Sequence, residues 1–242
     1  MTMMDFNADQ FKREFEQVTH ELAPSSANNE AVSVAELLTA SLESIDIMKR
    51  VDADMSAGNS DINAEDITQI GDYMLSLLMN LGDLAAQQSQ SQNMLYLHRL
   101  SLPVAMWVSQ YQGEIKQLEI IVNAIATLAN EIKEPRKLAE FAELIEKIVT
   151  HVNADIRRDL EAANQMRPWL ILNMNWGIVA TRSHDVAMMK RVFDAMINNI
   201  PVEAKQFFAE GMQQMEVVNY PPHVREVMQQ YHQTLGGGMH LS

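Results

Sequence analysis

Histidine is the side chain in this sequence best suited to metal binding and acid–base chemistry, and the chain has seven of them. Metal sites in helical bundles use Glu-x-x-His turns, which place both ligands on one face of a helix. None of the seven histidines has an acidic residue three positions before it, and the His-Glu-x-x-His pattern of zinc proteases is absent. We therefore expect no metal site, no cofactor and no catalytic residue of these classes.

His184 and Asp185 form a second candidate, as a general base and the carboxylate that would orient it. Adjacent residues of a helix do not face each other, and no nucleophile or oxyanion donor accompanies the pair. The glycine-rich phosphate-binding motifs are also absent. We interpret His184 and Asp185 as a turn and an N-cap before a helix over residues 185–198.

The segment from Asp52 to Asp66 carries enough carboxylates to invite comparison with a calcium-binding loop. Counted from Asp54, the sixth position is Asn59, whereas the sharp turn of such a loop needs glycine there. We interpret the segment as an acidic loop in which Asn63 caps the next helix, with Asp66 three residues further on.

The composition excludes several other classes of protein. The chain has 242 residues, a formal net charge of −14 and no cysteine, so disulfides, thiolate metal sites and cysteine nucleophiles are ruled out. An acidic chain lacks the basic face that a general nucleic-acid binder needs. The N-terminus has no basic start with an apolar run, and no segment is long and apolar enough to span a bilayer. We expect a cytoplasmic protein without nucleic-acid or membrane partners.

Acidity is concentrated at one end of the chain. Residues 1–90 contain 16 acidic and four basic residues, whereas residues 91–242 contain 16 acidic and 14 basic ones. Two interpretations stay open at this point. The acidic segment is a solvated surface that keeps the protein soluble, or it is a docking surface for a basic partner.

Apolar residues recur at helical spacing along most of the chain, as in the stripe Phe11, Phe15, Val18 and Leu22. No segment alternates apolar and polar residues over a useful length, so the sequence predicts an all-α protein. It favours four regions: an N-terminal amphipathic helix and linker over 1–30, an acidic helical segment over 31–92, a helical-hairpin array over 93–235 and a flexible glycine-rich tail over 236–242.

Four prolines in the second part of the chain stand at nearly equal intervals, at Pro103, Pro135, Pro168 and Pro201. Proline is tolerated in the first turn of a helix, where its missing N–H would have no partner anyway. Each interval contains a second break, at 112–113, 153, 183–184 and 219–222. The pattern predicts four helix–turn–helix units, because a period in the thirties made of paired helices is typical of stacked hairpins.

One interval of this pattern carries several positions of a known motif, namely Trp176, Gly177, Phe193, Ala195 and Pro201. With these residues, the segment 172–201 resembles a tetratricopeptide repeat. The resemblance implies a right-handed α/α superhelix of antiparallel helical hairpins, in which the glycine permits close packing and the proline closes the unit. His184 stands where this family usually has a turn glycine.

Aromatic residues anchor both hydrophobic cores and interfaces, so those of the predicted array are candidates for contact with a partner. The candidate partner-binding residues are Trp107, Tyr111, Trp169, Asn173, Trp176 and Arg182. Methionine is also abundant, with 18 residues. These methionines fill gaps in the core, or they line a permissive groove for partner helices.

The regular proline spacing and the missing catalytic motifs favour a non-enzymatic helical-repeat scaffold that binds another protein or a peptide. Two alternatives remain. One is a helical enzyme or small-ligand binder with a pocket between its two halves, whose chemistry would come from His98, His151 and His184. The other is a structural homodimer built on apolar helix faces.

Overall fold

The computed structural model describes residues 6–22, 34–58, 61–159, 164 and 166–236. Over these residues it contains eleven helices and, apart from one isolated bridge between Ile115 and Val152, no β-structure. The predicted all-α class is therefore confirmed for this part of the chain. No helix in it is both long enough and apolar enough to cross a bilayer. Within the helix and linker expected over 1–30, the residues from 23 onward lie outside the described residues, as does the tail beyond 236.

The chain divides into two compact units, one of residues 1–127 with 150–153 and the other of residues 128–149 with 154–242. The division therefore falls after residue 127, whereas the sequence favoured a boundary between 92 and 93. The helix that begins at Ser91 groups with the first unit because it packs along the preceding helix.

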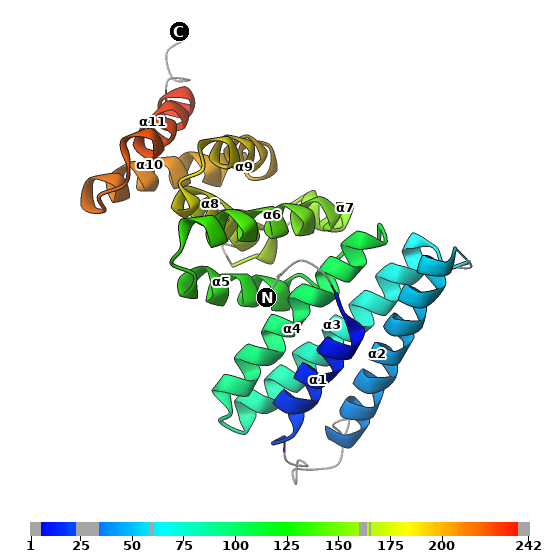
Figure 1. The fold of residues 1–242 in the computed structure, drawn as a ribbon. Coiled ribbons are helices and arrows are strands. Elements are labelled where there is room, and N and C mark those ends of the chain that lie inside the picture. Colours follow the sequence, from blue (N-terminus) through cyan, green and yellow to red (C-terminus); the bar gives the residue numbers. More distant parts are fainter. Residues whose placement is uncertain (1–5, 23–33, 59–60, 160–163, 165, 237–242) are drawn as a thin grey trace. The chain divides into compact units, whose positions relative to one another are not determined.

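The first unit is a group of helices that pack side by side (Figure 1). They are α1 (Ala8–Thr19), α2 (Val34–Ala57), α3 (Ala64–Gln87) and α4 (Ser91–Gln110), followed by the start of α5 (Glu119–Glu131). α3 packs against both α2 and α4, and α1 packs against α2 and α4. The predicted stripe is confirmed at Phe11 and Phe15, which are buried on α1, whereas Val18 is half-buried and the buried Leu22 lies beyond the end of the helix.

The start of α3 is capped as the sequence predicted. The Asn63 side chain accepts hydrogen bonds from the backbone N–H groups of Glu65 and Asp66, at 2.8 and 3.1 Å. The Asp66 carboxylate in turn accepts from the Asn63 backbone N–H at 3.0 Å. This reciprocal arrangement satisfies N–H groups that have no partner inside the helix.

The second unit contains the remaining helices (Figure 1). They are α6 (Pro135–His151), α7 (Ala154–Arg157), α8 (Pro168–Ser183), α9 (Val186–Asn199), α10 (Pro201–Val217) and α11 (Pro222–Gly236). α9 packs against α8, α10 and α11. Five methionines of this unit are at most 3% exposed and fill its core: Met188, Met189, Met196, Met215 and Met228.

Three of the four evenly spaced prolines begin a helix, as predicted: Pro135, Pro168 and Pro201. The prediction is wrong at Pro103, which lies inside α4. A proline in a helix interior costs about 3 kcal/mol or more because it removes a backbone hydrogen bond. Nearly all the neighbouring residues from Leu100 to Ser109 are buried, and this burial offsets the cost.

The predicted series of four hairpins is therefore only half present. Residues 168–200 form the hairpin α8–α9, and residues 201–235 lie in the hairpin α10–α11. The interval 135–167 has only the four-residue α7 after α6, and the interval 103–134 begins in the middle of α4. The backbone breaks predicted at 112–113, 153, 183–184 and 219–222 all fall outside or at the ends of helices.

The α8–α9 hairpin has the tight packing that its sequence pattern implied. A Cβ atom on Gly177 would lie 2.5 Å from Met196 Sδ and 2.8 Å from Phe207 Cζ. The Phe193 ring packs edge-on against Phe207 and Phe208, with centroid distances of 5.9 and 4.9 Å. These contacts join α8 and α9 to α10.

The turn between α8 and α9 is built from His184 and Asp185. His184 has φ +59°, in the left-handed region that glycine usually occupies at the end of a helix. Asp185 accepts a hydrogen bond from the Met188 backbone N–H at 3.0 Å and caps α9. The predicted turn and N-cap are confirmed.

Candidate functional site

Two of the predicted partner-binding residues lie one turn apart on α4 in the first unit. Trp107 Nε1–H and the Tyr111 hydroxyl both donate to the same oxygen of Asp52, at 2.7 and 2.9 Å. Trp107 is fully buried, whereas Tyr111 is half-buried. Burial, followed by the hydrogen bond to Asp52, raises the pKa of Tyr111 to about 12. The three side chains tie α4 to α2.

Three more of these residues lie on α8 in the second unit, and each is at most 2% exposed. Asn173 donates to the Trp169 carbonyl and accepts from the Asn199 side chain, both at 2.9 Å. Trp176 Nε1–H donates to the Ala142 carbonyl of α6 at 3.0 Å. These contacts attach α8 to the end of α9 and to α6.

Partner contact by these residues stays a prediction. The side chains of Trp107, Trp169, Asn173 and Trp176 are buried, so a partner would reach them only after the surrounding helices moved. Tyr111 and Arg182 are partly accessible. With four of the six residues buried, a partner would first meet the solvent-facing sides of the same helices.

α8 has one partly exposed face, on the side of the helix away from its tryptophans. From Trp169 to Ser183, ten residues are buried, and the five that are not repeat at helical spacing. We call these five residues the α8 stripe: Ile171, Met174, Asn175, Ile178 and Arg182. Ile178, near the middle, is 42% exposed.

The chemistry of the α8 stripe is unusual for a solvent-facing helix surface. Three of its members, Ile171, Met174 and Ile178, are apolar. The opposite side of α8 is also apolar, so the helix is hydrophobic around most of its circumference. Such a helix is normally buried on all sides. The α8 stripe therefore has the composition of a surface that another apolar element covers.

Arg182 forms the C-terminal end of the α8 stripe and has a structural role of its own. Its guanidinium donates to the carbonyl oxygens of Ala129 and Ile132, at the C-terminal end of α5. The last carbonyls of a helix have no partner within it, and a cation there also complements the helix dipole. Arg182 thus caps the C-terminal end of α5.

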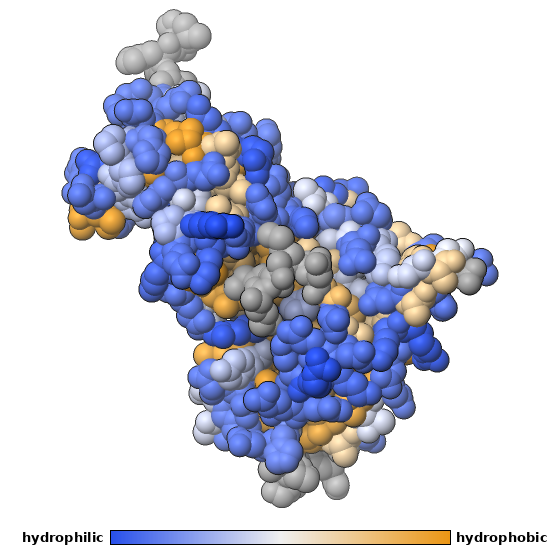
Figure 2. Space-filling view, in the orientation of Figure 1, coloured by the Kyte–Doolittle hydropathy of each residue, from blue (hydrophilic) through white to orange (hydrophobic). Residues whose placement is uncertain are grey.

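Exposed large apolar side chains are concentrated in the second unit. The face drawn in Figure 2 is mostly hydrophilic, and its hydrophobic areas are small and separate. Among the described residues, five of the eight exposed large apolar side chains belong to the second unit: Met166, Ile178, Val202, Val217 and Val218. Ile178 shares its helix face with the apolar residues Ile171 and Met174, and on α3 Tyr73 likewise has Ile70 three positions before it.

A groove runs along α2 in the first unit, and its lining does not favour one class of ligand. Its described lining residues all belong to that helix: Glu43, Asp46, Ile47, Lys49, Arg50 and Ala53. Two of the charged residues are already engaged, since Asp46 pairs with Lys12 at 2.9 Å and Lys49 pairs with Asp9 at 2.5 Å. The lining has two acidic and two basic side chains, so it selects neither sign of charge.

The three histidines that the sequence singled out for chemistry are divided between the two units. His98 and His151 belong to the first unit and His184 to the second. His184 packs edge-on against the Tyr220 ring at 5.8 Å, and His223 Nε2 lies 3.3 Å from the His184 carbonyl oxygen. Burial, with a smaller effect of the His223 charge, lowers the pKa of His184. Within the described ranges no three His, Cys, Asp or Glu side chains could hold a metal ion.

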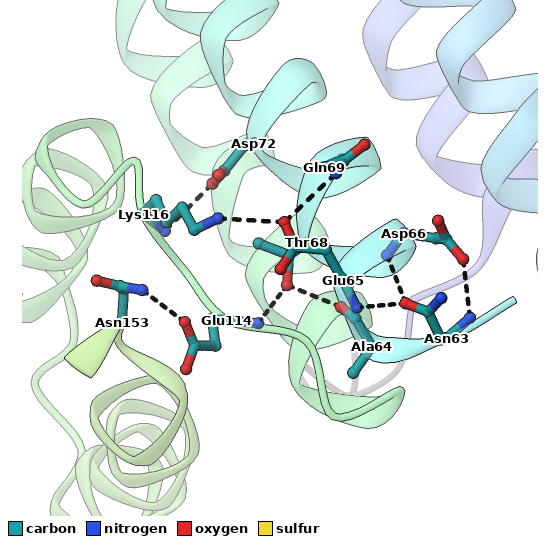
Figure 3. A network of polar contacts seen from close by, with 10 residues as sticks. All are labelled: Asn63, Ala64, Glu65, Asp66, Thr68, Gln69, Asp72, Glu114, Lys116 and Asn153. Atoms are coloured by element: carbon teal, nitrogen blue, oxygen red, sulfur yellow. Dashed lines mark hydrogen bonds and ion pairs between the residues drawn. The ribbon is translucent and has the colours of Figure 1, made fainter. Parts of the chain in front are cut away.

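A polar network in the first unit holds the loop between α4 and α5 against α3 (Figure 3). Thr68 Oγ1 accepts from the Glu114 backbone N–H at 2.8 Å, and an Asp72 carboxylate oxygen accepts from the Lys116 backbone N–H at 3.1 Å. Burial raises the pKa of Asp72, although its hydrogen bonds to backbone N–H groups oppose the shift.

The same loop also binds the short segment 150–153. Ile115 donates its backbone N–H to the His151 carbonyl at 2.7 Å and accepts from the Asn153 backbone N–H at 2.9 Å. The Glu114 carboxylate accepts from the Asn153 side chain at 2.5 Å, as Figure 3 shows. The network fixes backbone segments of the loop between α4 and α5, so we assign it a structural role.

Comparison with known protein families, with curated proteins and with solved structures finds no match to this chain. The α8 stripe is the surface in the described residues whose chemistry most clearly suits a ligand. Sequence reasoning found one of its members, Arg182, and missed the others, although their helical spacing from Ile171 to Ile178 is readable from the sequence.

Proposed function

We propose that this protein is a non-enzymatic helical scaffold that binds a protein or peptide partner through the α8 stripe. The observation that supports this most directly is the partly exposed apolar face of α8, where Ile178 is 42% exposed and Ile171 and Met174 are half-buried. An exposed apolar surface beside a rigid helical support is a common site of protein association.

The hairpins α8–α9 and α10–α11 support the scaffold proposal. Their first helices both begin at a proline, 33 positions apart, and α9 of the first hairpin packs against both helices of the second. We propose that they are tetratricopeptide-like units of a right-handed α/α superhelix. In such arrays the first helices of successive hairpins line an extended binding surface, and α8 is a first helix.

The acidic first part of the chain favours a partner that carries a net positive charge. Residues 1–90 carry 16 acidic residues against four basic ones. Long-range attraction by such a surplus speeds the encounter with a basic partner and weakens with salt. We propose a cytoplasmic protein partner that is basic overall and whose apolar contact is made with the α8 stripe.

The test compares two substitutions at exposed apolar positions of the second unit. Ile178→Asp places a charge in the α8 stripe, and Val202→Asp places one on α10, where Val202 is 78% exposed. Full-length protein and both variants serve as bait in lysate of the source organism, after circular dichroism has shown that all three are folded. A partner captured by wild type and Val202→Asp, and at least tenfold less by Ile178→Asp, supports the proposal. Equal capture by all three contradicts it.

A further inference from the structure

We infer that α1 is a detachable cover of the first unit, which undocks as one piece while α2, α3 and α4 stay folded. α1 packs on α2 and α4 (Figure 1), so the surface beneath it is a helix-binding surface with α1 as its resident ligand. This inference is independent of the α8 stripe, which belongs to the second unit. It follows from how α1 is attached, from how the other helices are joined without it and from its place in the chain.

The apolar attachment of α1 is small. The helix has 12 residues, and isolated helices shorter than ~12–15 residues are marginal in water, so α1 is helical because it is docked. Its large buried side chains are Phe11 and Phe15, which are 3% and 1% exposed. Just before the helix, the Phe6 ring lies 5.5 Å from the Phe11 ring and 6.3 Å from the Trp107 ring. A few aromatic contacts therefore provide most of the attachment.

The polar attachment of α1 is exposed to water. Two ion pairs join it to α2, Lys12 with Asp46 at 2.9 Å and Asp9 with Lys49 at 2.5 Å, and the four side chains are 34–61% exposed. Ion pairs between exposed side chains contribute little to stability. Asp46 and Lys49 also belong to the lining of the groove along α2, so water reaches this edge of the contact. The ion pairs therefore orient α1 more than they hold it.

The helices α2, α3 and α4 are joined to one another by contacts that do not involve α1. α3 and α4 approach closely, since a Cβ atom on Gly71 would lie 2.2 Å from Val108 Cγ2. Asp52 ties α2 to α4 by accepting from the buried Trp107 indole at 2.7 Å. The parts of a protein that open most readily are those with few buried contacts. α1 therefore undocks at a lower free energy than the unit unfolds.

The place of α1 in the chain lets it move without disrupting the unit. α1 precedes the other helices and is joined to α2 through residues 20–33. A chain of that length reaches up to about 45–50 Å when fully extended. An undocked α1 stays tethered and returns at a high effective concentration. The tethered copy therefore competes with an added helix for the surface beneath it.

Hydrogen exchange of the intact full-length protein, followed by mass spectrometry, tests the undocking. We expect protection factors in α1 at least tenfold lower than those in α3 and α4. Phe15→Ala should abolish the protection of α1 and leave that of α3 and α4 within a factor of two. The control is Glu16→Ala at an exposed position of α1, which should leave all three helices unchanged. Equal protection of the three helices in the wild type, or a loss in α3 and α4 with Phe15→Ala, would overturn the inference.

A second experiment tests the surface beneath α1 as a helix-binding surface. Residues 24–30 of the full-length protein are replaced by the recognition sequence of a site-specific protease, and the chain is cleaved there without separating the two parts. A fluorescent peptide of residues 6–22 should then exchange with the cleaved α1, as measured by fluorescence anisotropy.

Two comparisons make this experiment specific. The peptide with Phe11→Ala and Phe15→Ala should bind the cleaved protein at least tenfold more weakly than the unchanged peptide. The uncleaved protein should bind the unchanged peptide at least tenfold more weakly than the cleaved one, because its own α1 is tethered. Absence of binding, equal binding of both peptides, or equal binding before and after cleavage would overturn the inference.

Discussion

One oxygen of Asp52 accepts hydrogen bonds from two aromatic side chains on the next-but-one helix, Trp107 and Tyr111. A buried donor that loses its acceptor costs more than the hydrogen bond itself contributes, because the group is left desolvated. The Trp107 indole is fully buried, so its N–H would have no acceptor without Asp52. Tyr111 is half-buried, so its hydroxyl can donate to water instead. Asp52 therefore stabilises the fold mainly by accepting the hydrogen bond of the Trp107 indole.

Replacing Asp52 tests this arrangement. Asp52→Ala should lower the free energy of unfolding by about 1–3 kcal/mol, because the indole N–H loses its acceptor. It should also move the pKa of Tyr111 down from about 12, since one cause of that shift is removed. Urea unfolding and ultraviolet titration measure the two effects. Asp52→Asn keeps an acceptor oxygen and should cost less; an equal cost would show that the negative charge matters more than the hydrogen bonds.

His98 gives the first unit a pH dependence. The imidazole is 8% exposed, and burial lowers its pKa, while the charges of Asp83 and Glu119 oppose the shift. The unfolded chain then binds a proton more readily than the native protein. Stability contributed by neutral His98 is therefore present above about pH 6.5 and is lost as the pH falls below that value.

The variant His98→Gln should flatten this dependence. Thermal unfolding between pH 7.5 and 5.5 should show the wild type losing stability on acidification and His98→Gln losing less. The control is His20→Gln, at an exposed position just after α1, which should follow the wild-type profile. Parallel profiles for wild type and His98→Gln would contradict the assignment to His98.

At the scale of helices, close approach depends on a few glycines. A Cβ atom on Gly71 of α3 would lie 2.2 Å from Val108 Cγ2 of α4, and the branched valine cannot easily turn away. Gly211 on α10 is also crowded, but there the nearest atom is Met228 Sδ at 2.7 Å, in a flexible side chain. An added Cβ would therefore displace a rigid side chain at Gly71 and a flexible one at Gly211.

Alanine at the two positions should have different effects. Gly71→Ala should destabilise the protein by about 1–3 kcal/mol through overpacking, despite a gain of helix propensity of ~1 kcal/mol. Gly211→Ala should change the free energy of unfolding by less than about 1 kcal/mol, since the Met228 side chain can move. Chemical denaturation measures both. Adding Val108→Ala to Gly71→Ala should recover part of the loss, and no recovery would contradict the proposed clash.

At the scale of the whole molecule, the buried Arg167 holds two segments of the second unit together through ion pairs. The Arg167 side chain is 2% exposed and pairs with Asp159 at 2.5 Å and with Glu203 at 2.7 Å. These partners come from the segment before α8 and from α10, so one cation joins both. Removing it leaves two half-buried carboxylates without their common partner.

Arg167→Met should therefore destabilise the second unit selectively. We expect a loss of about 3–5 kcal/mol, typical of breaking a buried ion pair by removing one partner. Hydrogen exchange followed by mass spectrometry should show lower protection in peptides from α8 to α11 and unchanged protection in α2 to α4. A uniform loss across both groups would show that the chain unfolds as one cooperative unit.

Local patterns in the sequence were sufficient for the helical class, the cap at Asn63, the turn at His184 and three of the four helix starts at proline. Each depends on short-range hydrogen bonding or backbone geometry, which a few neighbouring residues determine. Pro103 was the exception, because burial on both sides of it outweighs the cost of a proline inside a helix.

Only the tertiary structure decided which side of α8 faces solvent. The helix is apolar around most of its circumference, so its sequence has no polar face that marks the exposed side. Contacts with Ala142 of α6 and Asn199 of α9 bury the side with Trp176 and Asn173. Ile178 is left exposed as a result, and Ile171 and Met174 are left half-buried. Which face of a uniformly apolar helix is free depends on residues far away in the sequence.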